Sequence, residues 1–366
     1  MGLSVGIVGL PNVGKSTLFN ALSDAGAEAA NYPFCTIEPN QGIVLVPDSR
    51  LDELVRVITP KSTVPTTVTF VDIAGLVAGA SKGEGLGNQF LAHIRSVDAI
   101  AHVVRCFEDD NIQHVANKVD PVSDVETIDT ELILRDIQSL EKRLERARKQ
   151  SKSGDKTEKL AFDMLPRVID ELSSGKSARQ LELTDDERGI LDELDLLTAK
   201  PIFYVANVGE DQLAAGLEDP LVQRLVEKVA PTGAEVVVIS ANIEAEIAAL
   251  DPEERTEFLA EIGLAEPGLN KLIRTAYGLL DLITYFTAGE KECRAWTIKR
   301  GTKAPGAAGV IHSDFERGFI KAEVIFWETL VELGSEAAAK AAGKLRIEGK
   351  EYVVRDGDVM HFRFNV

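Results

Sequence analysis

The chain has 366 residues, 45% of them hydrophobic and 27% charged, so it can bury a large core, and its length predicts two or three domains. Its formal net charge of −19 opposes non-specific nucleic-acid binding by the molecule as a whole. No apolar run approaches the roughly 18 residues of a membrane span, and no basic leader precedes Leu3, so we expect a soluble cytosolic protein with no membrane partner.

The first predicted elements are a strand, a glycine-rich loop and a helix. Residues 3–8 are apolar and end at Gly9, and a helical pattern begins at Lys15. The segment between them, GLPNVGKS, satisfies GxxxxGK[ST], the P-loop that holds nucleotide phosphates. Because the match lies between a strand and a helix, we predict an ATP- or GTP-binding site here.

Each fixed position of this loop has a physical role. Gly9 and Gly14 allow a tight turn that points main-chain N–H groups at the phosphates. Lys15 should reach the β- and γ-phosphates and assist catalysis, and the Ser16 hydroxyl should bind Mg²⁺. The predicted nucleotide-binding residues of this segment are Asn12, Val13, Gly14, Lys15, Ser16 and Thr17.

Two further segments indicate a nucleotide-dependent switch. Asp72 follows the apolar run 68–71 and begins DxxG, so it should bind Mg²⁺ through water, and the Gly75 amide should contact the γ-phosphate. Thr36, in the breaker-rich loop 31–36, is the expected second Mg²⁺ ligand. Leu76 occupies the position of the glutamine that orients water in Ras-like enzymes. Another group or a partner must orient the water, or hydrolysis is slow.

Further apolar runs predict strands at 42–46, 68–73, 99–104, 201–206 and 235–239, with helices between most of them. Strands that are apolar on both faces are typical of a parallel sheet covered by helices. We therefore expect an α/β fold of the P-loop NTPase type.

Between residues 131 and 199 the alternation stops. Apolar residues recur at spacings of four and three from Ile133 to Ala147, which predicts a helical coiled coil inserted into the α/β domain. A second helix is expected at 159–172, and Thr184 with Glu187 predicts a capping box for a third. Residues 131–160 hold nine Lys/Arg against six Asp/Glu. This surface is either an ordinary solvated helix face or a contact for RNA or protein.

The last predicted region, residues 281–366, is a small α+β domain. Aromatic and β-branched runs between glycines predict strands at 294–298, 344–347, 352–354 and 360–364, with one helical stretch.

Two segments compete for recognition of the base. Guanine-specific enzymes use NKxD at the carboxyl end of a buried strand, and residues 117–120 copy it but follow the polar loop 107–116. The strand 201–206 leads instead into Asn207-Val208-Gly209-Glu210, where Val208 replaces the lysine and Glu210 the aspartate. The strand 235–239 ends in Ser240-Ala241, the usual SAx element. We predict that Asn207, Val208, Ser240 and Ala241 bind the base, which favours ATP.

These motifs together resemble the Obg-like ATPases, also called the YchF family. The resemblance rests on NxxGKST at 12–17, NYPFCTIEPN at 31–40, DIAGLVAGASKGEGLGNQFL at 72–91, NVGE at 207–210, the inserted coiled coil and a C-terminal domain that looks like a TGS module. It implies a P-loop nucleotide-binding domain at 1–130 and 200–280, a coiled-coil domain at 131–199, and a TGS-like β-grasp domain at 281–366.

The resemblance also implies an activity. It predicts an ATPase that prefers ATP over GTP, needs Mg²⁺, and modulates translation or stress responses as a monomer on the ribosome, either the large subunit or the 70S particle. The coiled coil and the TGS-like domain would make that contact. His114 resembles the family's water-positioning histidine, and Asn12 an asparagine that binds K⁺ in related proteins.

Two alternatives remain open. An Obg-type ribosome-assembly GTPase would recognise guanine through residues 117–120. A nucleotide-gated adaptor with little intrinsic hydrolysis would explain Leu76.

Overall fold

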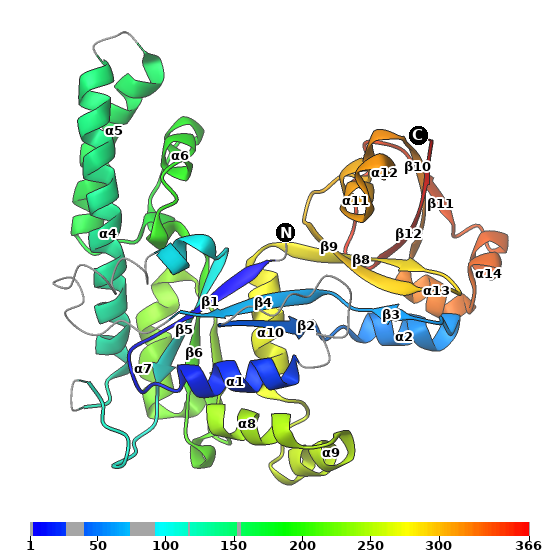
Figure 1. The fold of residues 1–366 in the computed structure, drawn as a ribbon, viewed down its shortest axis with the longest axis horizontal. Coiled ribbons are helices and arrows are strands. Elements are labelled where there is room, and N and C mark those ends of the chain that lie inside the picture. Colours follow the sequence, from blue (N-terminus) through cyan, green and yellow to red (C-terminus); the bar gives the residue numbers. More distant parts are fainter. Residues whose placement is uncertain (1–2, 27–39, 74–91, 116–117, 152–154, 366) are drawn as a thin grey trace.

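A six-stranded sheet with the spatial order β2-β4-β1-β5-β6-β7 forms the centre of the N-terminal part of the chain (Figure 1). The structure is a computed structural model that describes residues 3–26, 40–73, 92–115, 118–151 and 155–365. All neighbours pair in parallel except β2, which pairs antiparallel with β4 at the edge. The strands are β1 (Ser4–Val8), β2 (Gln41–Leu45), β4 (Thr67–Asp72), β5 (Ala99–Arg105), β6 (Ile202–Asn207) and β7 (Val236–Ile239). The predicted P-loop α/β fold is therefore confirmed.

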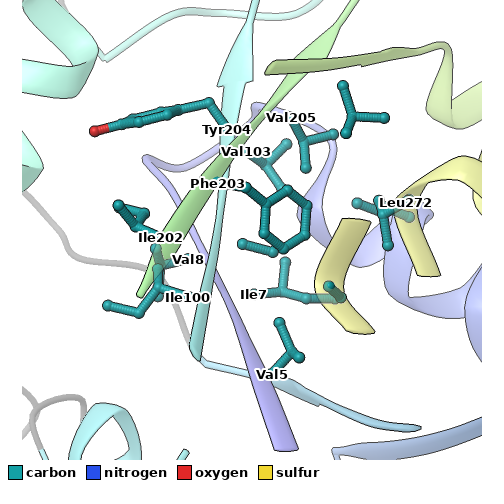
Figure 2. Close-up of a cluster of buried hydrophobic side chains, with 14 of the residues drawn as sticks. Val5, Ile7, Val8, Ile100, Val103, Ile202, Phe203, Tyr204, Val205 and Leu272 are labelled. Carbon is teal, nitrogen blue, oxygen red and sulfur yellow. The ribbon is translucent and has the colours of Figure 1, made fainter. Parts of the chain in front are cut away.

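The central strands are apolar on both faces because helices cover both faces. Every residue of β5 and β6 is buried. Figure 2 shows Phe203 on the side of Leu272 of α10, while the neighbouring Ile202 and Tyr204 point to the opposite side of the sheet. The flanking helices are α1 (Lys15–Ala25), α7 (Pro220–Val229), α8 (Ala241–Ala249), α9 (Pro252–Glu261) and α10 (Gly268–Leu279).

A long helical hairpin rises from this sheet (Figure 1). Helix α4 (Pro121–Gln150) has 30 residues and packs along α5 (Lys156–Ser173). At 1.5 Å per residue α4 is about 45 Å long. Its buried side chains pass from the sheet core to the hairpin core between Leu132 and Ile133. The predicted capping box of Thr184 is present and starts α6 (Asp185–Asp192).

Two buried polar contacts fix the hairpin. Arg143 of α4 donates to both carboxylate oxygens of Glu158 in α5, at 2.8 and 3.1 Å. At the base, Asp136 accepts from the main-chain N–H groups of Leu197 and Thr198 at 2.8 Å each. The first pair joins the two helices of the hairpin, and the second ties α4 to the segment that precedes β6.

The C-terminal region forms a second six-stranded sheet, with the order β11-β10-β12-β8-β9-β3. Its strands are β3 (Thr63–Val64), β8 (Leu282–Ala288), β9 (Cys293–Lys299), β10 (Phe319–Phe326), β11 (Arg346–Glu348) and β12 (Asp358–Phe364). The accompanying helices are α11 (Ala304–Ile311), α12 (Ser313–Arg317), α13 (Trp327–Leu333) and α14 (Glu336–Ala341). This mixed α+β architecture agrees with the predicted β-grasp-like domain.

Some predicted elements of this region were wrong. Residues 352–354 do not form a strand, because Val353 makes only an isolated bridge to Lys303 while the Tyr352 hydroxyl donates to Asp358. Strands β8 and β10 were not predicted, and several helices replace the single expected one.

An N-terminal segment also belongs to this second sheet. Helix α2 (Ser49–Ile58) buries Leu51 and Leu54 against Phe286 and Ile325, and β3 pairs with β9. Figure 1 shows α2, in blue, beside α13. Among the described residues, no helix is both long and apolar enough to cross a membrane.

Candidate functional site

A pocket of about 550 Å³ opens at the carboxyl ends of β1, β5, β6 and β7. This edge is where open α/β sheets bind ligands, and the volume lies within the roughly 300–1,000 Å³ of small-molecule sites. The lining residues are Asn12, Gly14, Lys15, Ser16, Thr17, Phe107, Glu108, Asp109, Ile112, Asn207, Val208, Gly209, Glu210, Ser240 and Asn242.

The pocket brings the predicted phosphate loop and the predicted base loop together. Of the predicted nucleotide-binding residues, all but Val13 and Ala241 line it. Those two contribute main-chain groups to the hydrogen bonds of Asn207 instead. Segments nearly 200 residues apart in the sequence thus form one site.

Glycine is required at positions 9 and 14 of the P-loop because neighbouring atoms lie too close to admit a Cβ. A Cβ at Gly9 would lie 2.4 Å from the main-chain oxygen of Val103, and one at Gly14 would lie 2.2 Å from Nδ2 of Asn207. Gly14 has a φ of +96°, which disfavours any other residue. It caps the N-terminus of α1, where main-chain N–H groups favour anions.

Lys15 is buried at the floor of this loop. Its Nζ donates to the main-chain oxygen of Leu10 at 2.7 Å. Burial lowers the pKa of Lys15 to about 8, and the negative charge of Asp72 acts in the opposite direction. A triphosphate would supply further negative charge and favour the protonated ammonium.

The side chains of Ser16 and Asp72 fit a Mg²⁺ site. Ser16 is exposed at the pocket, and Asp72 ends β4 with a buried Oδ1 that has no hydrogen-bond partner among the described residues. Burial raises the pKa of Asp72, and Lys15 opposes this shift. Hydroxyl, carboxylate and phosphate oxygens are the ligands that Mg²⁺ prefers.

Asn207 connects three segments of the site. Its Nδ2 donates to the Val13 main-chain oxygen at 2.8 Å, and its Oδ1 accepts from the Ala241 main-chain N–H at 2.9 Å. The adjacent Val208 is only 2% exposed. Gln212 adds a further link, since it accepts from the N–H of Gly209 and donates to the Cys106 oxygen.

The loop after β5 forms a wall of the pocket that sequence reasoning missed. Phe107, Glu108, Asp109 and Ile112 line the site, and the buried Arg105 donates to three main-chain oxygens of this loop. From the sequence, the loop of residues 107–116 is predicted only to be polar, with His114 as the one site residue singled out in it. Its position directly after a buried parallel strand was the available signal, since such loops face the ligand.

His114 lies beside the pocket but does not line it. It is 5% exposed, and its Nε2 lies 3.1 Å from Oδ2 of Asp124, at the start of α4. Burial raises the pKa of Asp124, and the hydrogen bond from His114 lowers it. The predicted catalytic role of His114 stays a prediction.

The competing NKxD copy lies outside the pocket. Asp120 precedes α4 and accepts from Arg224 of α7 at 2.8 Å, and Lys118 is exposed. Neither residue is among those that line the pocket. Asn117 is not among the described residues, and Thr36, Gly75 and Leu76 also lie outside them.

Two family models match the chain. One for the YchF GTPase C-terminal region, described as a protein of unknown function, matches residues 282–365. The other, described as a 50S ribosome-binding GTPase, matches residues 4–135. The first match spans β8 to β12 of the second sheet, and the second match includes β1, β2, β4 and β5 of the first sheet.

Full-length relatives are similar throughout. The ribosome-binding ATPase YchF of Bacillus subtilis is 58% identical over 366 residues, and that of Escherichia coli O157:H7 is 56% identical over 367, each covering 100% of both chains. A solved structure of the Schizosaccharomyces pombe YchF GTPase superposes with a TM-score of 0.89 at 40% identity, covering 99% of this chain and 98% of that one.

Proposed function

The chain belongs to the YchF family, and from this premise we propose that it is a ribosome-associated molecular switch that binds and hydrolyses ATP. The P-loop domain and the full-length similarity to proteins named ribosome-binding ATPases support this function. Modulation of translation or of stress responses would follow from the nucleotide state, in the cytoplasm and as a monomer.

The observation that carries the preference for ATP is the base loop at the end of β6. Asn207 and Ser240 line the pocket, whereas a buried valine occupies the lysine position of NKxD and Glu210 the aspartate position. A guanine-specific site needs paired acceptors on the guanine edge and a lysine over the ring. Here the lysine is replaced by Val208, and the longer Glu210 side chain would displace the carboxylate from the guanine edge. Selection of guanine is therefore weakened, because specificity rests on fully paired hydrogen bonds.

Mg²⁺ is the proposed cofactor, held by Ser16 and, through water, by Asp72. Bound there, it would neutralise charge on the β- and γ-phosphate oxygens. Thr36 remains the proposed further ligand. Asn12 donates its amide nitrogen to the Gln113 oxygen at 3.1 Å, which leaves its amide oxygen as the atom that would hold K⁺.

The proposed reaction is attack of water on the γ-phosphate. Lys15 would stabilise charge on the transferred group, and the backbone N–H groups at the start of α1 would bind the phosphates. His114 would orient the water, which requires it to exchange its contact with Asp124 for one with the site. Such exchange would tie hydrolysis to movement at the start of α4.

The helical hairpin is the proposed ribosome contact, together with the TGS-like domain. Near its tip, Arg146, Lys149, Lys156 and Lys159 are exposed, while the buried Arg143 is already paired with Glu158. A cluster of exposed cations in a chain of strongly negative charge favours contact with RNA phosphates of the large subunit or 70S particle.

Calorimetric titration with ATP and GTP in the presence of Mg²⁺ tests the proposal. We expect micromolar binding of ATP and none of GTP, and release of phosphate from ATP. Tight GTP binding with no ATP binding would contradict it.

A nucleotide-gated adaptor with little intrinsic hydrolysis is the second candidate. One observation favours it: the proposed water-positioning histidine is held against Asp124 instead of lining the pocket. The measurement of His114→Ala described in the Discussion separates the two functions.

A further inference from the structure

Arg105, at the end of β5, is fully buried. Main-chain oxygens and an aromatic ring surround its guanidinium group. Its Nε donates to the Phe107 oxygen at 3.0 Å, Nη1 to the Ile112 oxygen at 2.9 Å and Nη2 to the Asp109 oxygen at 3.2 Å. The guanidinium carbon lies 4.5 Å from the centre of the Phe107 ring. A planar guanidinium can satisfy several fixed acceptors at once, which a lysine ammonium does not reproduce.

All three acceptor oxygens belong to one wall of the pocket. Residues 107–112 form no helix or strand, so their carbonyl groups lack the partners that regular structure provides. Phe107, Asp109 and Ile112 line the pocket, whereas Arg105 itself does not. The shape of this wall therefore depends on a residue that stands behind it.

The wall begins at the base loop. A Cβ built on Gly209 would lie 3.8 Å from Cβ of Phe107, so the aromatic residue stands beside Val208 and Glu210. At its far end, the Gln113 oxygen accepts from Asn12. The phosphate-binding groups also have contacts that involve neither Arg105 nor residues 107–112, since Lys15 bonds to Leu10 and Gly14 lies against Asn207.

We propose that Arg105 is a positioning residue that fixes the nucleoside side of the pocket by holding residues 107–112 in one conformation. This inference rests on the proposed function, because it assumes that the pocket binds a nucleotide. It assigns affinity for the nucleoside to Arg105 and affinity for the phosphates to the P-loop.

The test compares Arg105→Met and Arg105→Lys with the unmodified protein. Affinities for ATP, ADP and inorganic tripolyphosphate are measured by calorimetry with Mg²⁺, and folding is checked by thermal unfolding. Arg179→Met is the matched control, because Arg179 also donates to main-chain oxygens, of Thr198 and Lys200, but lies outside the pocket.

We expect Arg105→Met to bind ATP and ADP about tenfold to a hundredfold more weakly, while tripolyphosphate affinity stays within about twofold. Arg105→Lys should also bind ATP and ADP more weakly and tripolyphosphate normally, but its affinity for ATP and ADP should fall less, because lysine keeps a donor and a charge. If Arg105→Met does not fold, the affinities of Arg105→Lys test the role of Arg105. Arg179→Met should bind all three ligands normally.

Unchanged ATP and ADP affinity in the folded variants would overturn the role of Arg105, and so would an equal loss for all three ligands. A failure of the unmodified protein to bind ATP and ADP would instead refute the proposed function.

Discussion

The side-chain amide nitrogen of Asn207 lies 2.8 Å from the main-chain oxygen of Val13, so one side chain joins the end of β6 to the phosphate loop. The same side chain accepts from the Ala241 N–H, at the start of α8. The relative position of the base loop and the phosphate loop is therefore set by one buried amide.

Asn207→Asp tests this link, because aspartate keeps the acceptor for Ala241 and replaces the donor to Val13 with an oxygen. We expect ATP affinity to fall about tenfold or more and the free energy of unfolding to fall by about 1–3 kcal/mol. Calorimetry and urea unfolding measure the two effects. Asn270→Ala is the control, since that amide donates to Glu266 away from the pocket. Unchanged ATP affinity in Asn207→Asp would refute the link.

Asp72→Asn should separate nucleotide binding from hydrolysis. The substitution keeps the shape but removes the charge beside Lys15, so ADP affinity without Mg²⁺ should change little. ATP turnover should fall about a hundredfold, and more Mg²⁺ should be needed for half-maximal rate. Phosphate release at several Mg²⁺ concentrations measures this. Asp98→Asn, which affects the bonds of Asp98 to Ser4 outside the pocket, should leave turnover unchanged.

His114→Ala should bind ATP normally and lose turnover by about a hundredfold, the range expected for a lost general acid–base or water-positioning group. It should also lower the free energy of unfolding by about 1–3 kcal/mol, because Asp124 loses a buried hydrogen-bond partner. Single-turnover hydrolysis and urea unfolding report the two effects separately. Normal turnover in this variant would remove His114 from the reaction.

His102 should make the fold sensitive to acid. It is fully buried in β5, and its two ring nitrogens have no hydrogen-bond partner among the described residues. Burial, together with the smaller effect of the positive charges of Lys15 and Arg179, lowers its pKa to about 3. Below about pH 6.5 the unfolded chain binds a proton here that the folded protein does not. Stability is therefore lost as the pH falls from about 6.5 to about 3, by about 1.4 kcal/mol per pH unit.

The variant His102→Leu should lose less folding stability than the unmodified protein when the pH falls below about 6.5. Urea unfolding at pH 7 and pH 5 should show a smaller difference than in the unmodified protein, by about 2 kcal/mol. His361→Leu, at an exposed position of β12, should leave the difference unchanged. An identical pH dependence in His102→Leu would contradict the assignment.

Lys149→Ala combined with Lys156→Ala tests the hairpin tip. If both ammonium groups contact RNA phosphates, the slope of log affinity for ribosomes against log salt should become less steep by about 2. ATP hydrolysis without ribosomes should stay the same. Lys271→Ala on α10 should leave the salt slope unchanged. An unaltered slope in the double variant would assign these lysines to an ordinary solvated surface.

The local chemistry of the sequence was sufficient to predict the central sheet and most of the pocket. No other residue fits the turns at Gly9 and Gly14. Apolar runs such as 99–104 are typical of central strands in a parallel sheet covered by helices. Their positions at strand ends then indicated which loops meet. Asn207 was found in this way.

Features that depend on distant partners were not predictable in the same way. Leu51 and Leu54 mark α2 as amphipathic, but nothing near them in the sequence shows that they pack on Phe286. Nothing in the sequence indicates that Arg105 is buried, because an arginine at the end of an apolar strand is usually exposed. The carbonyl groups that receive it become visible only when the loop is folded.

The contribution of α2 to the second sheet has a consequence for synthesis. Leu51 and Leu54 leave the ribosome more than 200 residues before Phe286 and Ile325, the residues that cover them. At about 5–20 residues per second, this apolar surface remains without one or both of its partners for roughly 10–55 s. During that time the nascent chain exposes this apolar segment, and we expect chaperones that bind exposed apolar segments to recognise it before the last strands emerge.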